Sequence, residues 1–294
     1  MASHARRPEI AITGASGAVG SRVADLLSAR GLPVVLVVRD ADRAPQLADA
    51  EVRLASGYVD TPAMTEAFEG CRSVFLVSGR ESAHRVAEHT SAVEAAVAAG
   101  VERVVYLSFQ GAAADCTFTF GRDHWHTEQL IRSTGMDFTF VRDSFYLAGL
   151  AGMCGPDGVI RGPAGEGAVA AVDHDDVAAV VAEVLSSRDF DGVTCDVTGP
   201  EAITLGEAAE QLSQAAGRPV RYVRETDAEA WASRAHYGAP DFEVRGWITS
   251  YESIANGEVA SVSDTVQRIA GQPPINFATY LARHPEAYAH LMTG

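Results

Sequence analysis

Short apolar runs alternate with amphipathic segments along the first half of the chain. Runs rich in β-branched residues predict six strands, at residues 10–13, 34–38, 52–54, 74–77, 104–107 and 138–141. These runs are apolar on both faces, which is typical of parallel strands. After the first run, Val19, Val23 and Leu27 share one helical stripe, and Gly31 stands where that helix should end. The alternation predicts an α/β fold, a Rossmann-type doubly wound parallel sheet.

The rhythm changes after Arg142, and the glycine- and proline-rich stretch at residues 149–167 predicts a loop close to the substrate. A helix starting near Asp175 and a strand-like run at 193–197 then return to the earlier pattern. Thr204 and Glu207 have the spacing of a capping box, and mostly helices follow. The predicted organisation is a dinucleotide-binding domain of residues 8–148, which 173–198 rejoins, and a smaller, mostly helical C-terminal substrate lobe of residues 149–172 and 199–294.

Composition narrows the range of partners and compartments. The 294 residues include 39 acidic and 23 basic side chains, and a net charge of −16 repels phosphate backbones, so we expect no nucleic-acid partner. The N-terminus lacks a signal-peptide pattern, and no apolar run could span a bilayer. The four cysteines are scattered without a C-x-x-C pair, which fits a reducing compartment. We therefore expect a cytoplasmic protein with no membrane partner, and a homodimer is left open.

A glycine-rich loop directly after the first predicted strand carries the strongest chemical signal. It has G-x-x-G-x-x-G spacing and opens an amphipathic helix. Gly14 permits the tight turn, Gly17 lets the backbone approach a pyrophosphate, and Gly20 lets the helix press on the sheet. Free amides at the helix start receive the negative charge. We expect a dinucleotide to be bound by Thr13, Gly14, Ala15, Ser16, Gly17, Ala18, Val19 and Gly20.

The end of the second predicted strand indicates which dinucleotide binds. An acidic residue there would hydrogen-bond the free 2′-hydroxyl of NAD, whereas Arg39 can pair with the 2′-phosphate of NADP in bidentate fashion. Asp40 follows directly and keeps NAD open. The sequence therefore predicts NADP(H) as the preferred cofactor and NAD(H) as the alternative.

Motifs at the predicted strand ends resemble those of a known family. They are the glycine loop, Val37-Val38-Arg39, Tyr106-Leu107-Ser108-Phe109-Gln110-Gly111, Asp123-His124-Trp125-His126-Thr127-Glu128 and Phe138-Thr139-Phe140-Val141-Arg142. With them the chain resembles atypical short-chain dehydrogenases/reductases of the NmrA-like family. That group includes quinone oxidoreductases, triphenylmethane-dye reductases and redox-sensing regulators. The resemblance implies cofactor contacts at Ser78, Gly79, Ser108 and Phe109, and near Tyr58 for the adenine.

One departure from that superfamily concerns the proton donor. Typical members carry Tyr-x-x-x-Lys after the fifth strand, where this chain has His124 and Glu128. Residues four apart share a helix face, so the Glu128 carboxylate would favour protonated His124 and the pair would act as a general acid. Alternatively no strong acid is needed, because an electron-poor acceptor gives an anion that takes its proton from water. No metal is expected, since His124 and His126 point to different sides of the helix.

The chain leaves the sixth predicted strand at the carboxyl edge of the sheet, where open α/β folds bind their ligands. We expect the substrate to contact Gln110, His124, Phe145 and Tyr146. Trp231, Tyr237 and Trp247 are candidates for a further aromatic wall, although aromatic side chains on such helices also serve as plain core.

Two functions fit these features. The first is an NAD(P)H-dependent oxidoreductase that transfers hydride to a small electron-poor acceptor, a quinone first and an azo, imine or dye compound next. The second is a non-catalytic NADP(H)-binding redox sensor that acts through a protein partner. The aromatic, loop-rich region after the sixth strand favours the enzyme, because a sensor does not require a separate pocket.

Overall fold

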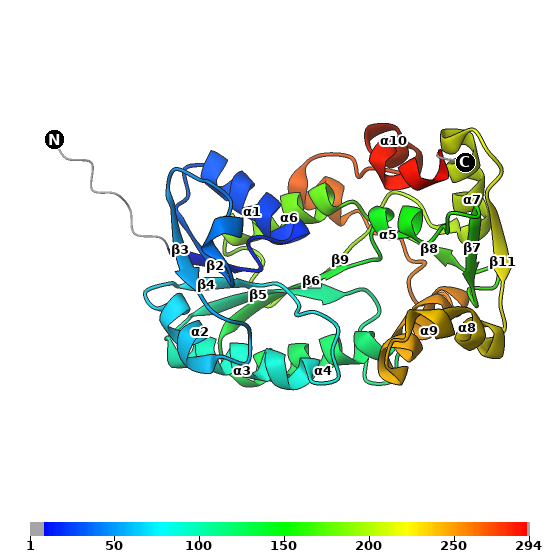
Figure 1. Ribbon diagram of the computed structural model, residues 1–294. Helices are drawn as coiled ribbons and strands as arrows, with labels where there is room; N and C mark the ends of the chain where they lie inside the picture. Colours follow the sequence, from blue (N-terminus) through cyan, green and yellow to red (C-terminus); the bar gives the residue numbers. More distant parts are fainter. Residues whose placement is uncertain (1–8, 293–294) are drawn as a thin grey trace. The chain divides into compact units, whose positions relative to one another are not determined.

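The structure is a computed structural model that describes residues 9–292 (Figure 1). Contacts within the chain divide it into two compact units. Unit 1 consists of the residues up to Ser108, Asp123–Arg142 and Val177–Cys195. Unit 2 consists of Phe109–Arg122, Asp143–Asp176 and the residues from Asp196 onward. Each unit is thus built from segments that are separated in the sequence.

A seven-stranded sheet forms the centre of unit 1, in the order β3-β2-β1-β4-β5-β6-β9 (Figure 1). Its strands are β1 (Ile10–Thr13), β2 (Val34–Val38), β3 (Ala50–Leu54), β4 (Ser73–Leu76), β5 (Arg103–Phe109), β6 (Asp137–Asp143) and β9 (Thr194–Val197). The registers of β1 with β2 and β4, of β2 with β3 and of β4 with β5 are parallel. The strand order reverses between β1 and β4, where doubly wound sheets bind ligands. The predicted Rossmann-type sheet is confirmed.

Helices cover both faces of this sheet. One face carries α1 (Ala18–Ala29) and α6 (His174–Ser186), and the other carries α2 (Thr61–Phe68), α3 (Arg85–Ala98) and α4 (Thr119–Ser133) (Figure 1). A 3-10 turn, η1 (Ala41–Arg43), lies between β2 and β3. Every residue of β2 and β5 is buried as a result. Removal of these apolar strands from water provides the main driving force for folding.

Unit 2 combines short helices with two small two-stranded sheets. Parallel β7 (Val159–Gly162) and β11 (Arg221–Arg224) form one sheet, and antiparallel β8 (Ala168–Val169) and β10 (Ile203–Thr204) form the other. The helices are α5 (Leu147–Gly152), α7 (Leu205–Ala216), α8 (Asp227–Arg234), η2 (Ala235–Tyr237), α9 (Asp241–Ala255), η3 (Val266–Ala270), α10 (Phe277–Arg283) and η4 (Pro285–Leu291). The predicted capping box of Thr204 and Glu207 is present at the start of α7.

The glycine- and proline-rich stretch from residue 149 contains regular structure, so the expectation of a continuous loop is wrong. α5 has six residues and β7 has four. Segments of that length show no sequence period, and packing rather than propensity stabilises them. Leu150 and Ile160 belong to the buried apolar core of unit 2, which holds both elements in place.

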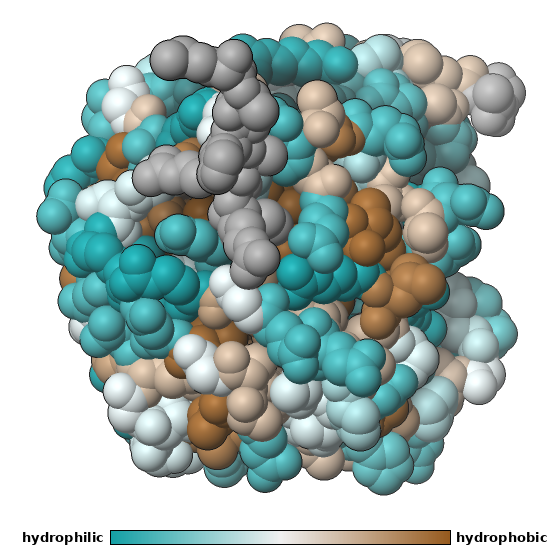
Figure 2. Space-filling model, turned by 90° about the vertical axis from the view of Figure 1, so that its left-hand side faces the viewer, coloured by the Kyte–Doolittle hydropathy of each residue, from teal (hydrophilic) through white to brown (hydrophobic). Residues whose placement is uncertain are grey.

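Hydrophilic residues cover most of the face that Figure 2 shows, which is the left-hand side of Figure 1. The hydrophobic residues on it form small, separate patches. Single exposed apolar side chains are normal on protein surfaces, and Leu54 and Val59 are examples. No helix within residues 9–292 is both long enough and apolar enough to cross a membrane.

Candidate active site

The turn between β1 and α1 has the geometry of a phosphate-binding loop. Gly14 has φ +58°, a left-handed conformation that disfavours any side chain, and its carbonyl accepts a hydrogen bond from the Gly17 amide at 2.8 Å. A Cβ atom on Gly20 would lie 2.3 Å from the Gly14 oxygen. Gly17 provides no side-chain cap for the first amides of α1. The glycine cradle therefore fits a pyrophosphate, as the spacing predicts.

Thr13 and Tyr58 fix the backbone beneath this loop. The Thr13 hydroxyl accepts a hydrogen bond from the Val77 amide at 2.9 Å and lies 2.7 Å from the Tyr58 hydroxyl. The Tyr58 hydroxyl donates to the Val77 carbonyl, and burial raises the pKa of Tyr58 well above its usual value. These two side chains tie the carboxyl ends of β1 and β4 together. The contact predicted between Tyr58 and the adenine stays a prediction.

Gly79, two residues after Val77, is held by a buried histidine. Its amide donates to Nε2 of His89 at 2.8 Å, and a Cβ atom on Gly79 would lie 3.1 Å from that nitrogen. Because Nε2 accepts, the ring proton is on Nδ1, which donates to the Thr127 hydroxyl at 2.8 Å. Burial, together with the positive charge of Arg85, lowers the pKa of His89 to about 3. His89 is therefore neutral at physiological pH.

Arg39 lies at the carboxyl end of β2 and its side chain is exposed. Among the residues that the structure describes, it has no hydrogen-bond or ion-pair partner, so its guanidinium is available to a ligand. The neighbouring Asp40 carboxylate accepts a hydrogen bond from the Asp42 amide at 3.0 Å and caps η1. The acidic residue that kept NAD open thus has a local structural role.

His124 lies on α4 and is buried, with 6% of its surface exposed. Its Nε2 atom accepts a hydrogen bond from the Arg85 guanidinium at 3.1 Å, and its Nδ1 atom lies 3.0 Å from the Tyr106 hydroxyl. Burial, and then the charge of Arg85, lower the pKa of His124 well below 6.5. The imidazole is therefore neutral, with its lone pair already engaged.

Glu128 has other partners than the sequence suggested. One carboxylate oxygen accepts from the Ser108 hydroxyl at 2.6 Å and from Arg142 Nε at 2.7 Å, and the other accepts from Arg142 Nη2 at 2.6 Å. The expectation that Glu128 keeps His124 protonated is wrong. Arg142 forms a bidentate ion pair with the Glu128 carboxylate, and the positive charge of Arg85 next to His124 disfavours a protonated imidazole. The predicted helix spacing is correct, but it does not fix which charges meet.

Sequence reasoning did not single out Arg85, His89 or Thr127 for this buried polar cluster. Arg85 and His89 stand four residues apart on α3, so they share a helix face that otherwise carries small apolar residues such as Ala92 and Val93. Polar side chains on the apolar face of a helix are a detectable signal. The sequence does not reveal which partners they meet.

The acceptor residues predicted after β5 and β6 belong to unit 2. The Phe145 ring lies 4.9 Å from that of Phe109. Tyr146 donates its hydroxyl proton to Asp143 and stacks on the His174 ring at 3.9 Å. These contacts hold the rings of Phe145 and Tyr146 in place after β6.

Gln110 is buried and one of its polar atoms lacks a protein partner. Its Nε2 atom donates to the Ser261 carbonyl at 2.8 Å, which fixes the orientation of the amide. Within residues 9–292 its Oε1 atom accepts no hydrogen bond. A buried acceptor without a donor destabilises a fold by about 1–3 kcal/mol, so this atom needs a donor from a ligand or a water molecule.

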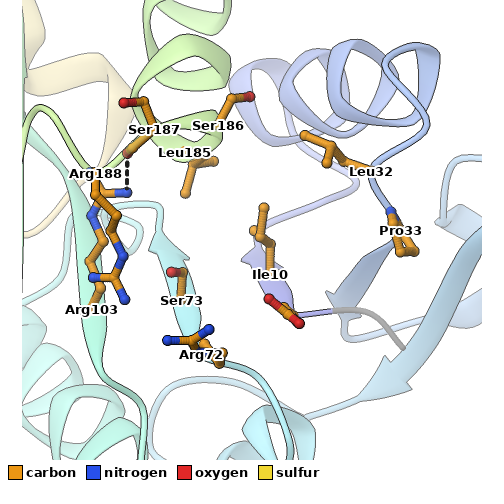
Figure 3. Close-up of a pocket in the computed structure, with 11 residues that line it drawn as sticks. Ile10, Leu32, Pro33, Arg72, Ser73, Arg103, Leu185, Ser186, Ser187 and Arg188 are labelled. Carbon is orange, nitrogen blue, oxygen red and sulfur yellow. Dashed lines mark hydrogen bonds between the residues drawn. The ribbon is translucent and has the colours of Figure 1, made fainter. Parts of the chain in front are cut away.

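A cavity of about 280 Å³ lies in unit 1 at the amino ends of β1, β4 and β5 (Figure 3). The Arg103 guanidinium donates to the Ser187 carbonyl at 2.9 Å and lies 2.6 Å from Asp191. Arg188 pairs with Glu102 at 3.0 Å. These cations are already neutralised, and the cavity is at the opposite edge of the sheet from the glycine loop. We assign it a structural role.

The buried histidines predict a specific loss of stability in acid. Each histidine remains neutral in the folded state but binds a proton near pH 6.5 once the protein is unfolded. Below that pH the unfolded state therefore binds more protons than the folded state, and the free energy of unfolding decreases as the pH is lowered. For His89, with a folded-state pKa of about 3, we expect a contribution of about 2 kcal/mol to the stability lost between roughly pH 7 and pH 5.

Urea unfolding of the protein and of His89→Gln at both pH values measures this. Glutamine can keep one donor and one acceptor but does not titrate, so the variant should lose about 2 kcal/mol less than the parent on acidification. An equal loss in both proteins would contradict a neutral His89.

The fold and the glycine loop together define a dinucleotide-binding Rossmann protein. The model of the NmrA-like family matches residues 6–258, so the chain belongs to the NmrA-like family. An NAD(P)H azoreductase from Xenophilus azovorans is 33% identical over 283 residues, which cover 95% of this chain and 99% of that protein.

Two solved structures are similar over the same extent. The NADPH-dependent quinone oxidoreductase of Escherichia coli, solved with NADPH, has a TM-score of 0.85 and 29% identity and covers 93% of this chain and 99% of its own. The triphenylmethane reductase of Citrobacter sp., solved with NADP(H), has a TM-score of 0.82 and 26% identity, with the same coverage. The predicted family, the oxidoreductase class and the nicotinamide cofactor are thereby confirmed.

Proposed function

We propose that this protein is an NADPH-dependent reductase of small electron-poor aromatic acceptors, quinones first and azo or other dye compounds next. The observation that carries this proposal is the glycine cradle, where Gly17 leaves the first amides of α1 without a side-chain cap, together with Arg39, which has no partner among the described residues. The similar proteins are named as an azoreductase, a quinone oxidoreductase and a triphenylmethane reductase, and these names point to acceptors of this kind. Bound NADPH would supply the hydride.

The protonation states in unit 1 support an acceptor that needs no strong acid. His124 is neutral, and Glu128 is engaged with Arg142 and Ser108, so neither is poised to give up a proton near neutral pH. A ketone would need such a donor as hydride arrives, whereas a quinone forms a stable anion. We therefore assign His124 and Glu128 positioning roles: His124 holds Arg85 and Tyr106, and Glu128 holds Arg142.

Unit 2 supplies candidate acceptor contacts of its own. The Oε1 atom of Gln110 is buried without a donor among the described residues, and a ligand hydroxyl, amide or bridging water would satisfy it. Phe145 presents an aromatic ring for a planar acceptor. The roles of Gln110, Phe145 and Tyr146 as substrate contacts are part of this proposal.

Turnover tests the proposal directly. The protein should consume reduced nicotinamide when mixed with NADPH and a panel of quinones and azo dyes. The rate should stay level from roughly pH 6 to pH 8, because His124 is neutral across this range and its protonation state does not change. Tight binding of both cofactor forms without turnover of any acceptor would instead favour the redox sensor.

Arg39 predicts cofactor choice. Replacing it with glutamine removes a charge-assisted, bidentate contact to the 2′-phosphate, so we expect KM for NADPH to rise about 10- to 100-fold while KM for NADH stays within about twofold. Steady-state kinetics with both cofactors measures this. Arg221→Gln, a change at an exposed arginine of unit 2, serves as the matched control. Equal losses for the two cofactors in Arg39→Gln would contradict a phosphate contact.

A further inference from the structure

Unit 2 contains a cavity of about 660 Å³, and Tyr237 and Trp247, two of the three residues considered above for a further aromatic wall, line it. It is lined by residues of α5, β7, α8, η2 and α9, and by the part of the chain that follows α5. This volume falls within the range of small-molecule pockets in proteins. Its lining side chains include Met153, Arg161, His236, Tyr237, Trp247 and Tyr251. The cavity lies entirely within one compact unit, so its shape is defined by that unit alone.

Aromatic rings form one side of this cavity. The Tyr237 ring meets the Trp247 ring edge to face, with the centroids 5.6 Å apart, and the His236 ring lies 3.9 Å from Tyr237. Tyr237 is 64% exposed, although aromatic residues usually bury most of their surface. A planar ligand ring would cover the exposed part of Tyr237 and remove that apolar surface from water.

The charged side chains in the lining itself are cationic, although each pairs with a carboxylate just outside it. The chain has a net charge of −16, yet the described side chains that line the cavity include two arginines and no carboxylate. Arg234 is buried and fixed by Glu225 at 2.9 Å, and it lies 5.1 Å from the Tyr251 ring, so it shapes the wall.

Arg161 is the cation that can reach a ligand. It pairs with Asp157 at 2.6 Å, and the two side chains are 40% and 51% exposed. Ion pairs at such exposure contribute little to stability, so the guanidinium can turn to a ligand at small cost. Two oxygens of a carboxylate or a sulfonate can each accept a hydrogen bond from the fork of an arginine, which matches them better than the ammonium of a lysine does.

We propose that this cavity binds a planar aromatic molecule that carries a carboxylate or sulfonate group, with its ring against Tyr237 and Trp247 and its anionic group on Arg161. The inference goes beyond the proposed reductase activity, because it needs neither cofactor nor hydride transfer. It rests on the shape, the rings and the charge of unit 2.

Calorimetric titration of the whole protein with naphthalene-2-sulfonate and with its neutral counterpart 2-naphthalenemethanol tests the proposal. The sulfonate should bind about tenfold more tightly than the neutral compound, and Arg161→Gln should remove that difference. Tyr237→Leu should weaken both compounds several-fold. Two changes outside the cavity in unit 2 serve as matched controls, Arg221→Gln and Phe242→Leu, and both should leave binding unchanged.

Aromatic sulfonates can also enter dinucleotide sites, so the titrations are repeated with saturating NADP⁺. Unchanged sulfonate binding in its presence supports the cavity in unit 2. The proposal is overturned if the protein binds no sulfonate, if NADP⁺ displaces it completely, or if Arg161→Gln and Tyr237→Leu bind it like the parent. Because the readout is binding without cofactor, it stands even if no acceptor is reduced.

Discussion

Replacing Gly20 with alanine is expected to weaken NADPH binding on the order of 100-fold, because the loop must open and lose charge-assisted contacts to the pyrophosphate. The new Cβ atom would lie 2.3 Å from the Gly14 carbonyl oxygen and 3.2 Å from the Ala15 Cα atom. Backbone atoms cannot swing aside as a flexible side chain can, so the turn itself must change. Calorimetric titration with NADPH, with urea unfolding alongside to verify the fold, measures the effect.

Gly206→Ala provides the matched control. Gly206 is also a glycine near the start of a helix, in α7, and a Cβ atom there would meet only the Thr204 hydroxyl at an ordinary 3.7 Å. This variant should bind NADPH like the parent. If Gly20→Ala also binds NADPH with unchanged affinity, the loop does not hold the diphosphate.

The second large effect is expected at the ion pair of Glu128 and Arg142. Arg142→Met leaves the Glu128 carboxylate buried with only the Ser108 hydroxyl as a described donor, and breaking such a buried pair costs about 3–5 kcal/mol of unfolding free energy. The double variant Glu128→Gln with Arg142→Met removes the buried charge as well. It should therefore be more stable than Arg142→Met alone, and urea unfolding of the three proteins measures the difference.

An exposed ion pair serves as the control that shows whether the loss of stability comes from burial of the charge or from loss of an ion pair as such. Arg72 and Glu102 lie 2.8 Å apart, but their side chains are 57% and 48% exposed. Water screens such a pair, so Arg72→Met should give no measurable change in stability. If the double variant is no more stable than Arg142→Met, or if the two single changes cost the same, the buried pair does not have the role assigned to it.

The parts of the site that could be predicted from the sequence are formed by residues that follow one another in the chain. The strand, the turn and the helix around Gly14, Gly17 and Gly20 are consecutive, so glycine spacing and hydrophobic period specify them together. Arg39 directly follows β2, and the hydrophobic pattern of the sequence marks the end of that strand. Such local rules also placed the carboxyl ends of the strands, and with them Ser78 and Gly79, at one edge of the sheet.

The environment of His124 could not be predicted in the same way. Its hydrogen-bond partners come from α3 and β5, 39 and 18 residues away in the chain, and the Arg142 that binds Glu128 comes from β6. Helix spacing correctly places His124 and Glu128 on neighbouring turns. The charges that surround a buried group depend on which strands and helices pack together, and these decide its protonation state.

Short helices and strands are a second feature that could not be predicted from the sequence. The six residues of α5 and the four of β7 show no period of their own, and the glycines among them suggested a loop. The apolar core of unit 2 stabilises both through Leu150 and Ile160. The cavity that they help to line could not be found without that packing, although its rings at Tyr237 and Trp247 were visible as aromatic positions.

The central claim is that the amides around Gly14–Gly20 and the guanidinium of Arg39 bind NADPH. Calorimetric titration of the purified protein with NADPH and with NADH tests it most directly. The account predicts one site per chain, with NADPH bound at least tenfold more tightly than NADH, roughly the discrimination expected from one bidentate phosphate contact. Folded protein that binds neither nucleotide would contradict it.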